Sequence, residues 1–143
     1  MREIDVKQIT DVVEKLCIEA NEHLPEDVKC AIKNCRACED GEIAKGVLDN
    51  IIENFEIADN ECVPICQDTG IAVVFLKVGM NVQWDATMSV QEMVNEGVKR
   101  AYADPTNPLR ASVLADPAGA RKNTKDNTPA VVHYEIVPGH HVD

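Results

Sequence analysis

Residues 63–70, VPICQDTG, run directly into residues 71–78, IAVVFLKV. The second half is an almost continuous apolar run, rich in β-branched residues and bounded by glycines, which is typical of a strand covered on both faces. Immediately before it, a thiol, an amide and a carboxyl follow one another at Cys66, Gln67 and Asp68. This stretch therefore predicts both a central strand of the fold and a candidate functional site.

The composition of the 143 residues predicts one folded domain over residues 1–143. Hydrophobic residues make up 45% of the chain but aromatic residues only 3%, so we expect an aliphatic core with few rings to stack on bases. A net charge of -11 would repel a phosphate backbone and disfavours nucleic-acid binding. The charged first residues and the lack of a long apolar run predict a cytoplasmic protein with no membrane association, whose six cysteines are not in disulfides.

Apolar residues recur at helical spacing in three amino-terminal segments, which predicts helices over residues 4–20, 25–38 and 43–55. The third segment has the most regular apolar stripe and is expected to be the core helix of this half. Periodicity is lost over residues 56–70. Further on, Ser89 and Glu92 have the spacing of a capping box and predict a fourth helix. One face of that helix is expected to carry Val90, Met93, Val94, Gly97, Val98 and Ala101.

The rest of the chain predicts a long loop over residues 116–129 and a second strand over residues 130–137. Helices come first, followed by strand, helix, loop and strand. We therefore expect an α+β fold, in which the amino-terminal helices pack with a small mixed sheet.

The central motif has two interpretations at Cys66 and two at Asp68. Cys66 could be a small buried apolar residue, or its thiolate could bind a metal or cluster. Asp68 could cap the turn at Gly70, or it could move protons if its pKa is tuned. The amide of Gln67 is suited to orienting a carboxylate or a hydroxyl, since it carries a donor and an acceptor.

Two other groups of residues could carry chemistry. Cys35 and Cys38 form a Cys-x-x-Cys pair, which with Cys30 and Cys62 suggests a zinc site, although no second pair has zinc-ribbon spacing. Basic residues outnumber acidic ones between positions 99 and 125, and Arg110 could bind a carboxylate bidentately. The alternative is a solvated basic face, and His133 is expected to be a core or edge residue of its strand.

Four blocks of the sequence, taken in order, carry a family resemblance. They are PICQDTG at 64–70 before the apolar strand, NPLR at 107–110, RKNTKDNTPA at 121–130 and EIVPG at 135–139. Together they resemble the iron–sulfur class I fumarate hydratases and the related L-tartrate dehydratase α subunits. The resemblance covers residues 64–139, while the helical amino-terminal half carries weaker motifs.

The resemblance implies a hydro-lyase that reversibly hydrates or dehydrates a small dicarboxylate. Fumarate to L-malate is the first expectation and tartrate dehydration the second. In that family a [4Fe-4S] cluster is held by three cysteine thiolates. The match implies that Cys66 is a cluster ligand, that Gln67 and Arg110 bind substrate, and that Asp68 transfers a proton.

The resemblance also implies that the chain is the amino-terminal part of a longer α-type catalytic region. It would then supply one thiolate of the three, and a β subunit or β region and further copies would complete the oligomer. We expect the chain alone to hold no stable cluster and to be inactive. A non-catalytic scaffold or assembly module of the same fold is the alternative, and a zinc protein built on the other cysteines is a third possibility.

Overall fold

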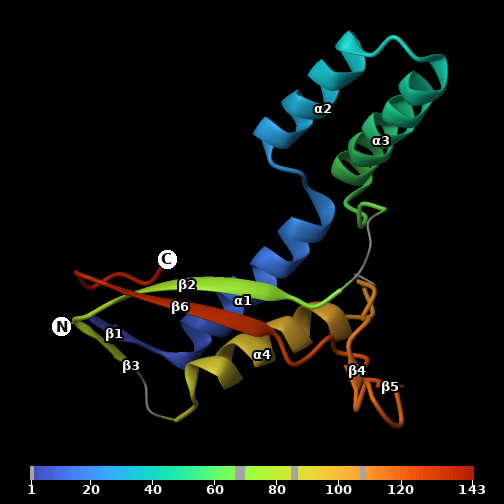
Figure 1. Cartoon of the computed structure of the whole chain (residues 1–143). Helices are drawn as coiled ribbons and strands as arrows, with labels where there is room; N and C mark the ends of the chain where they lie inside the picture. Colours follow the sequence, from blue (N-terminus) through green and yellow to red (C-terminus); the bar gives the residue numbers. More distant parts are fainter. Residues whose placement is uncertain (1, 67–69, 85–86, 107–108) are drawn as a thin grey trace. The chain divides into compact units, whose positions relative to one another are not determined.

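The computed structural model describes residues 2–66, 70–84, 87–106 and 109–143 (Figure 1). Contacts divide the chain into two compact units, of which unit 1 comprises Met1–Cys17 and Thr69–Asp143 and unit 2 comprises Ile18–Asp68. In sequence, unit 2 is inserted between the two segments of unit 1. The helices and short strands confirm the α+β class, and the single domain over residues 1–143 stays a prediction.

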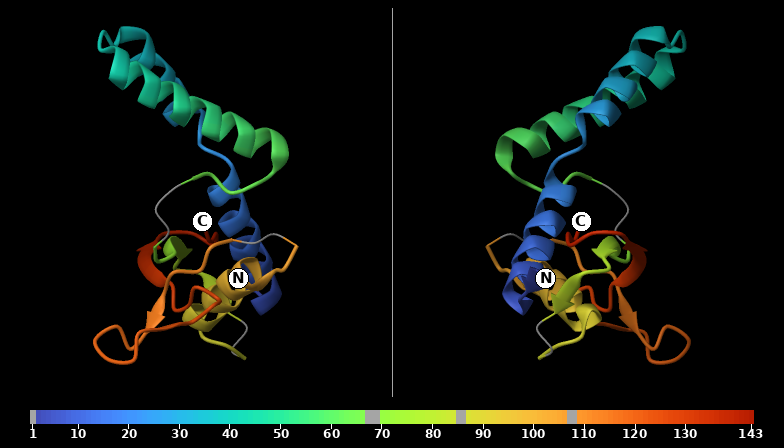
Figure 2. Two further views of the ribbon diagram at one scale, coloured as in Figure 1. Left: turned by 90° about the vertical axis from the view of Figure 1, so that its right-hand side faces the viewer. Right: turned by 90° about the vertical axis from the view of Figure 1, so that its left-hand side faces the viewer.

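Unit 2 is built around a helical hairpin. Helix α2 (Glu26–Cys38) and helix α3 (Glu42–Glu61) lie side by side and antiparallel (Figure 2). Helix α2 begins one residue after its expected start, because Pro25 is its N-cap. Helix α3 extends beyond the expected end at residue 55. Once a helix is packed at Phe55 and Ala58, adding a further residue costs little, so the helix continues to Glu61 without an apolar stripe. It ends where Cys62 adopts a left-handed conformation, with φ of 52°.

Few apolar side chains are buried in this hairpin. No residue of α2 is buried, and only Phe55 and Ala58 are buried on α3. Ile43, which begins the predicted apolar stripe, is 88% exposed, so the expectation of a core helix is wrong for this end of α3. Three ion pairs join the two helices. They are Lys29–Asp59, Lys33–Glu56 with an N–O distance of 2.9 Å, and Arg36–Asp49 with an N–O distance of 2.6 Å.

Unit 1 contains the main apolar core. The first part of helix α1 (Val6–Glu22) packs against helix α4 (Val90–Ala103), which begins with the predicted capping box at Ser89. The predicted face of α4 is confirmed, since Met93, Val94, Gly97, Val98 and Ala101 are buried. A Cβ atom on Gly97 would lie 2.7 Å from the carbonyl oxygen of Thr10, so the absence of a side chain lets the two helices approach closely.

Strand β2 (Val73–Gly79) is the central strand of unit 1. Strand β6 (Val131–Val137) pairs with it in parallel along its whole length, which confirms the second predicted strand. Residues 141–143 pair antiparallel with the other edge of β2, through bonds such as Lys77 N–H to Asp143 O at 2.8 Å. The arrangement around β2 is therefore mixed, as expected.

The chain crosses the end of β2 to reach that second edge. Gly139 has φ of +122°, and a Cβ atom on Gly79 would lie 2.7 Å from the carbonyl carbon of Gly139. Glycine at both positions permits the crossing, because one needs a left-handed backbone and the other leaves room for it.

Only one face of β2 is covered in unit 1. Leu76 and Val78 point into the core with α1 and α4, whereas Val73 is 51% and Phe75 73% exposed. The predicted burial on both faces is wrong, because helices α1 and α4 lie on the same side of the strand and no other described element of unit 1 covers the opposite side.

Two further pairs of short strands complete unit 1. Strand β1 (Arg2–Ile4) is parallel to strand β3 (Val82–Trp84), and strand β4 (Leu114–Ala115) is antiparallel to strand β5 (Lys122–Asn123). Apart from β5, residues 116–129 form the expected loop. Among the described helices, none combines the length and the apolar character that crossing a membrane would need.

Candidate functional site

Cys66 lies in unit 2, just after the end of α3. The backbone N–H of Ile65 donates to the carbonyl oxygen of Asn21 at 2.8 Å, and the N–H of Cys66 donates to Oδ1 of Asn54 at 2.9 Å. These bonds fix the backbone, while the thiol itself is exposed. The interpretation of Cys66 as a small buried apolar residue is therefore wrong, and a ligand or nucleophile role is chemically open to it.

The next two candidate residues, Gln67 and Asp68, lie outside the described residues. Their assignments as substrate contact and proton-transfer residue stay predictions. The described backbone resumes in unit 1 at Gly70, the last residue of the motif.

Within unit 1, Asn127 connects two of the sequence blocks with the segment that follows a third. Its side chain is fully buried, with Oδ1 accepting from the N–H groups of Ser112 at 2.8 Å and Val113 at 3.2 Å. Its Nδ2 donates to the carbonyl oxygen of Gly70 at 3.1 Å. The end of the PICQDTG block, the segment just after NPLR and the RKNTKDNTPA block are thereby held together by one side chain.

Arg110 lies two residues before Ser112, directly after the buried Leu109. Its side chain is exposed, and among the described residues no carboxylate pairs with it. A guanidinium that has not been neutralised by a described neighbour can bind an anion bidentately. Arg110 and Cys66 belong to different units, and each is positioned only within its own.

The loop that carries Asn127 is fixed by further side-chain bonds to the backbone. Asn95 on α4 accepts from the N–H of Ala130 at 3.0 Å, and Asn123 donates to the carbonyl oxygen of Ala111 at 2.8 Å. Burial raises the pKa of Asp126, but hydrogen bonds from Thr128, Thr124 and the Asp126 backbone together outweigh burial and leave this pKa below its ordinary value. These contacts order the loop without tertiary apolar packing along most of its length.

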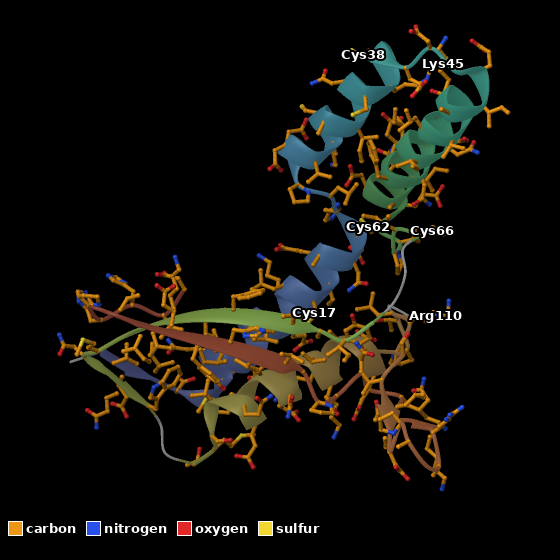
Figure 3. The ribbon with its side chains drawn as sticks, viewed as in Figure 1. Cys17, Cys38, Lys45, Cys62, Cys66 and Arg110 are labelled. Atoms are coloured by element: carbon orange, nitrogen blue, oxygen red, sulfur yellow. The ribbon has the colours of Figure 1, made fainter. Side chains whose placement is uncertain are left out.

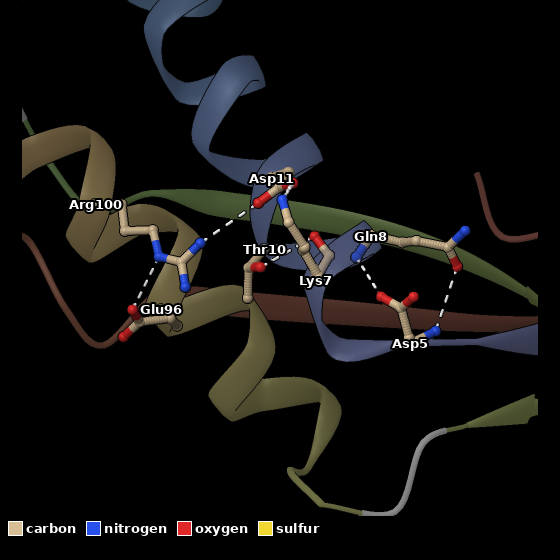
Figure 4. A network of polar contacts seen from close by, with 7 residues as sticks. All are labelled: Asp5, Lys7, Gln8, Thr10, Asp11, Glu96 and Arg100. Atoms are coloured by element: carbon tan, nitrogen blue, oxygen red, sulfur yellow. Dashed lines mark hydrogen bonds and ion pairs between the residues drawn. The ribbon is translucent and has the colours of Figure 1, made fainter.

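One member of the basic excess between positions 99 and 125, Arg100, already has acidic partners. Arg100 is paired with Glu96 at 2.9 Å and with Asp11 at 3.4 Å, and Asp11 also binds Lys7 (Figure 4). A shallow hollow of about 450 Å³ lies here. Its cations already have acidic partners, so the solvated-face interpretation holds for Arg100.

The other cysteines do not assemble a zinc site. Cys30, Cys35 and Cys38 lie on α2, whereas Cys62 follows the far end of α3, and Figure 3 shows Cys38 and Cys62 at opposite ends of the hairpin. Within the described ranges, no group of three His, Cys, Asp or Glu side chains is placed to hold a metal ion. The four-cysteine zinc hypothesis is wrong because the hairpin separates its ligands.

The positions of the described cysteines also decide whether they could hold an iron–sulfur cluster. Cys66 offers an exposed thiol on a fixed backbone, which suits one ligand. Burial raises the pKa of Cys17 to about 11, which disfavours the thiolate that iron needs. The described residues alone do not fit a cluster that needs three thiolates.

Comparison with known proteins places these blocks in one family. The family model described as fumarate hydratase (Fumerase) matches residues 10–143. A Methanocaldococcus jannaschii protein named "Putative L(+)-tartrate dehydratase subunit alpha" is 46% identical over 107 residues, covering 75% of this chain and 37% of that protein. A Geobacillus stearothermophilus "Putative fumarate hydratase class I" is 31% identical over 125 residues, covering 85% and 23%.

An L(+)-tartrate dehydratase subunit alpha from Escherichia coli strain UTI89 is 26% identical over 133 residues, covering 93% of this chain and 43% of the relative. The chain thus spans less than half the length of these relatives. The family match runs through the three segments that meet at Asn127 and through the segment that carries Cys66. On this evidence the chain belongs to the fumarate hydratase (Fumerase) family of hydro-lyases.

Proposed function

We propose that the chain is the amino-terminal part of an α-type catalytic region that hydrates fumarate to L-malate or dehydrates tartrate. The observation that carries this proposal is the buried Asn127, which joins the end of the PICQDTG block to the segment after Arg110. Because one fully buried amide holds two family blocks and the segment after Arg110 together, it supports a shared site at their junction.

The reaction requires a proton and a hydroxyl to leave from neighbouring carbons, or to be added in reverse, with no net electron transfer. Arg110 would neutralise a substrate carboxylate and so stabilise the negative charge that builds up when the adjacent carbon loses its proton. Asp68 would accept that proton, and Gln67 would orient the substrate. Cys66 would contribute one thiolate to a [4Fe-4S] cluster, whose other ligands come from outside the described residues.

The relatives named as alpha subunits support a β subunit or β region as the partner. We also propose a cytoplasmic enzyme that assembles as a homo-oligomer. For the chain alone, anaerobic incubation with iron and sulfide is expected to yield neither a stoichiometric cluster nor turnover. A stoichiometric cluster with fumarate hydration would contradict this part of the proposal.

A chimeric subunit provides the positive test. This chain replaces the corresponding segment of the Methanocaldococcus jannaschii relative, and the product is assayed anaerobically for fumarate hydration and L-tartrate dehydration. Cys66→Ser, Asp68→Asn and Arg110→Lys are expected to lower turnover at least about a hundredfold. The matched control Arg121→Lys changes an exposed basic residue in the next block and is expected to leave turnover unchanged.

The non-catalytic scaffold remains the second candidate, because the described residues hold no three-ligand metal group and much of α3 presents apolar side chains to solvent. It predicts a chimera that folds and assembles but turns over neither substrate. Substitution at Asp68 would then have no measurable effect on any assembly property.

A further inference from the structure

The segment that carries Cys66 turns back along helix α3. The helix ends at Glu61, and Cys62 takes the left-handed conformation that reverses the chain. The backbone N–H of Cys66 then donates to Oδ1 of Asn54 at 2.9 Å, and Asn54 lies about two turns before the end of the helix. Figure 2 shows this return of the chain after α3. Helix α3 therefore supports Cys66 directly.

A second hydrogen bond holds the residue before Cys66. The N–H of Ile65 donates to the carbonyl oxygen of Asn21, near the end of α1, at 2.8 Å. That end of α1 is itself joined to α3, because Nδ1 of His23 lies 2.7 Å from Oδ1 of Asp59. Two consecutive N–H groups of the segment are thus bonded to acceptors that are held by α3 directly or through α1.

Fixing the backbone of a cysteine restricts its sulfur to few positions. A single torsion angle separates the backbone of Cys66 from its sulfur, and that angle has three staggered values. The thiol is exposed, so its sulfur can meet a ligand without any movement of the backbone. Asn54 suits the supporting role, because it is half-buried on a helix and its short side chain has few rotamers.

We propose that Asn54 is a positioning residue for Cys66, which holds this thiol where it binds the iron–sulfur cluster. The inference rests on the ligand role proposed above for Cys66. Asn54 would act on the cluster only through the N–H group of Cys66. Partners of this kind around a metal ligand typically contribute about tenfold to a hundredfold to metal affinity. Loss of the Asn54 acceptor is therefore expected to weaken retention of the cluster while unit 2 stays folded.

Amide hydrogen exchange of the isotope-labelled chain, measured by NMR, tests the hydrogen bond itself. Asn54→Ala removes the acceptor and is expected to speed exchange of the Cys66 N–H about fivefold, while the N–H of Val63 keeps its rate. Asn54→Asp keeps an acceptor of the same shape and is expected to retain the slow exchange. The matched control Asn50→Ala makes the same substitution at an exposed position one turn earlier on α3 and should change neither rate. An unchanged exchange rate of Cys66 in Asn54→Ala would overturn the proposal.

Cluster release from the chimeric subunit tests the consequence for the ligand. The chimera is loaded anaerobically with iron and sulfide, and the loss of its visible absorbance is followed in excess chelator. Asn54→Ala is expected to release the cluster about tenfold faster, whereas Asn54→Asp and Asn50→Ala are expected to release it at the wild-type rate. Circular dichroism should stay unchanged in all three variants, since neither alanine nor aspartate breaks a helix.

The outcomes separate this inference from the proposed function. A wild-type chimera that holds no cluster would overturn the proposed function and this inference with it. A cluster that leaves Asn54→Ala at the wild-type rate would overturn this inference alone. Equally rapid release from Asn54→Ala and Asn54→Asp would overturn it as well, because the hydrogen-bond acceptor would then not be what retains the cluster.

Discussion

Replacing Asn127 tests how far one buried amide holds unit 1 together. Asn127→Ala removes two accepted hydrogen bonds, from Ser112 and Val113, and one donated bond to Gly70. At about 1 kcal/mol for each bond the loss is about 3 kcal/mol. Asn127 has φ of 58°, where asparagine is tolerated better than alanine, which adds up to about 1 kcal/mol.

Urea unfolding measures this loss. The single tryptophan, Trp84, packs against the core of unit 1, so its fluorescence reports on the unit that contains Asn127. We expect Asn127→Ala to lower the free energy of unfolding by about 3–4 kcal/mol. The control Asn50→Ala removes an exposed amide from α3 and is expected to change Trp84 unfolding by less than about 0.5 kcal/mol.

A conservative variant separates the donor from the acceptor. Asn127→Asp keeps an acceptor for the two N–H groups but faces a carboxylate toward the Gly70 carbonyl. Its loss of stability is expected to shrink as the pH is lowered, because a protonated carboxyl can donate to that carbonyl again. A loss below about 1 kcal/mol for Asn127→Ala would refute the role of this amide as the connection between the three segments.

Three further outcomes are expected. Gly97→Ala should destabilise unit 1 by about 3 kcal/mol in urea unfolding, since the added Cβ atom would collide with α1. A Cβ atom at Gly46 would have no neighbour within 4 Å, so Gly46→Ala should stabilise α3 by about 1 kcal/mol. The hydrogen bond from Arg36 holds the pKa of Asp49 below its ordinary value of 3.8. The ion pair therefore stabilises the hairpin above pH 3.8, and this stabilisation is lost as the pH falls through the lowered pKa. The helical circular dichroism signal should fall in acid, and it should fall less in Asp49→Asn. Ser89→Ala should cost about 1 kcal/mol in thermal or urea unfolding through loss of the capping box, and an unchanged midpoint would contradict that role.

The elements with local signals could be predicted from the sequence. The capping box at Ser89 and the apolar face of α4 depend on residues within one or two turns of each other, and both are confirmed. Burial could not be predicted in the same way. Phe75 and Ile43 look like core residues in a linear pattern, but their exposure depends on which elements pack against them.

In the candidate site, too, local features could be predicted from the sequence and tertiary contacts could not. The motif around Cys66 was recognisable in the sequence, and the structure shows that this thiol is exposed, but the ligand role of Cys66 stays a prediction. Asn127 had no recognisable role, because its three partners come from segments distant in sequence and meet only in the folded unit. Strands β1 and β3 were also missed, since three residues are too few to show alternation.

The insertion of unit 2 within unit 1 has a consequence for the order of folding during synthesis. Helices α2 and α3 are neighbours in sequence, so the hairpin can form as soon as it leaves the ribosome. Strand β1 and helix α1 emerge before the hairpin but must wait for α4, and β2 must wait for β6 and residues 141–143. Helix α1 is therefore made before the hairpin but becomes native after it, and until then the core face of α1 is open to chaperones and to misassembly.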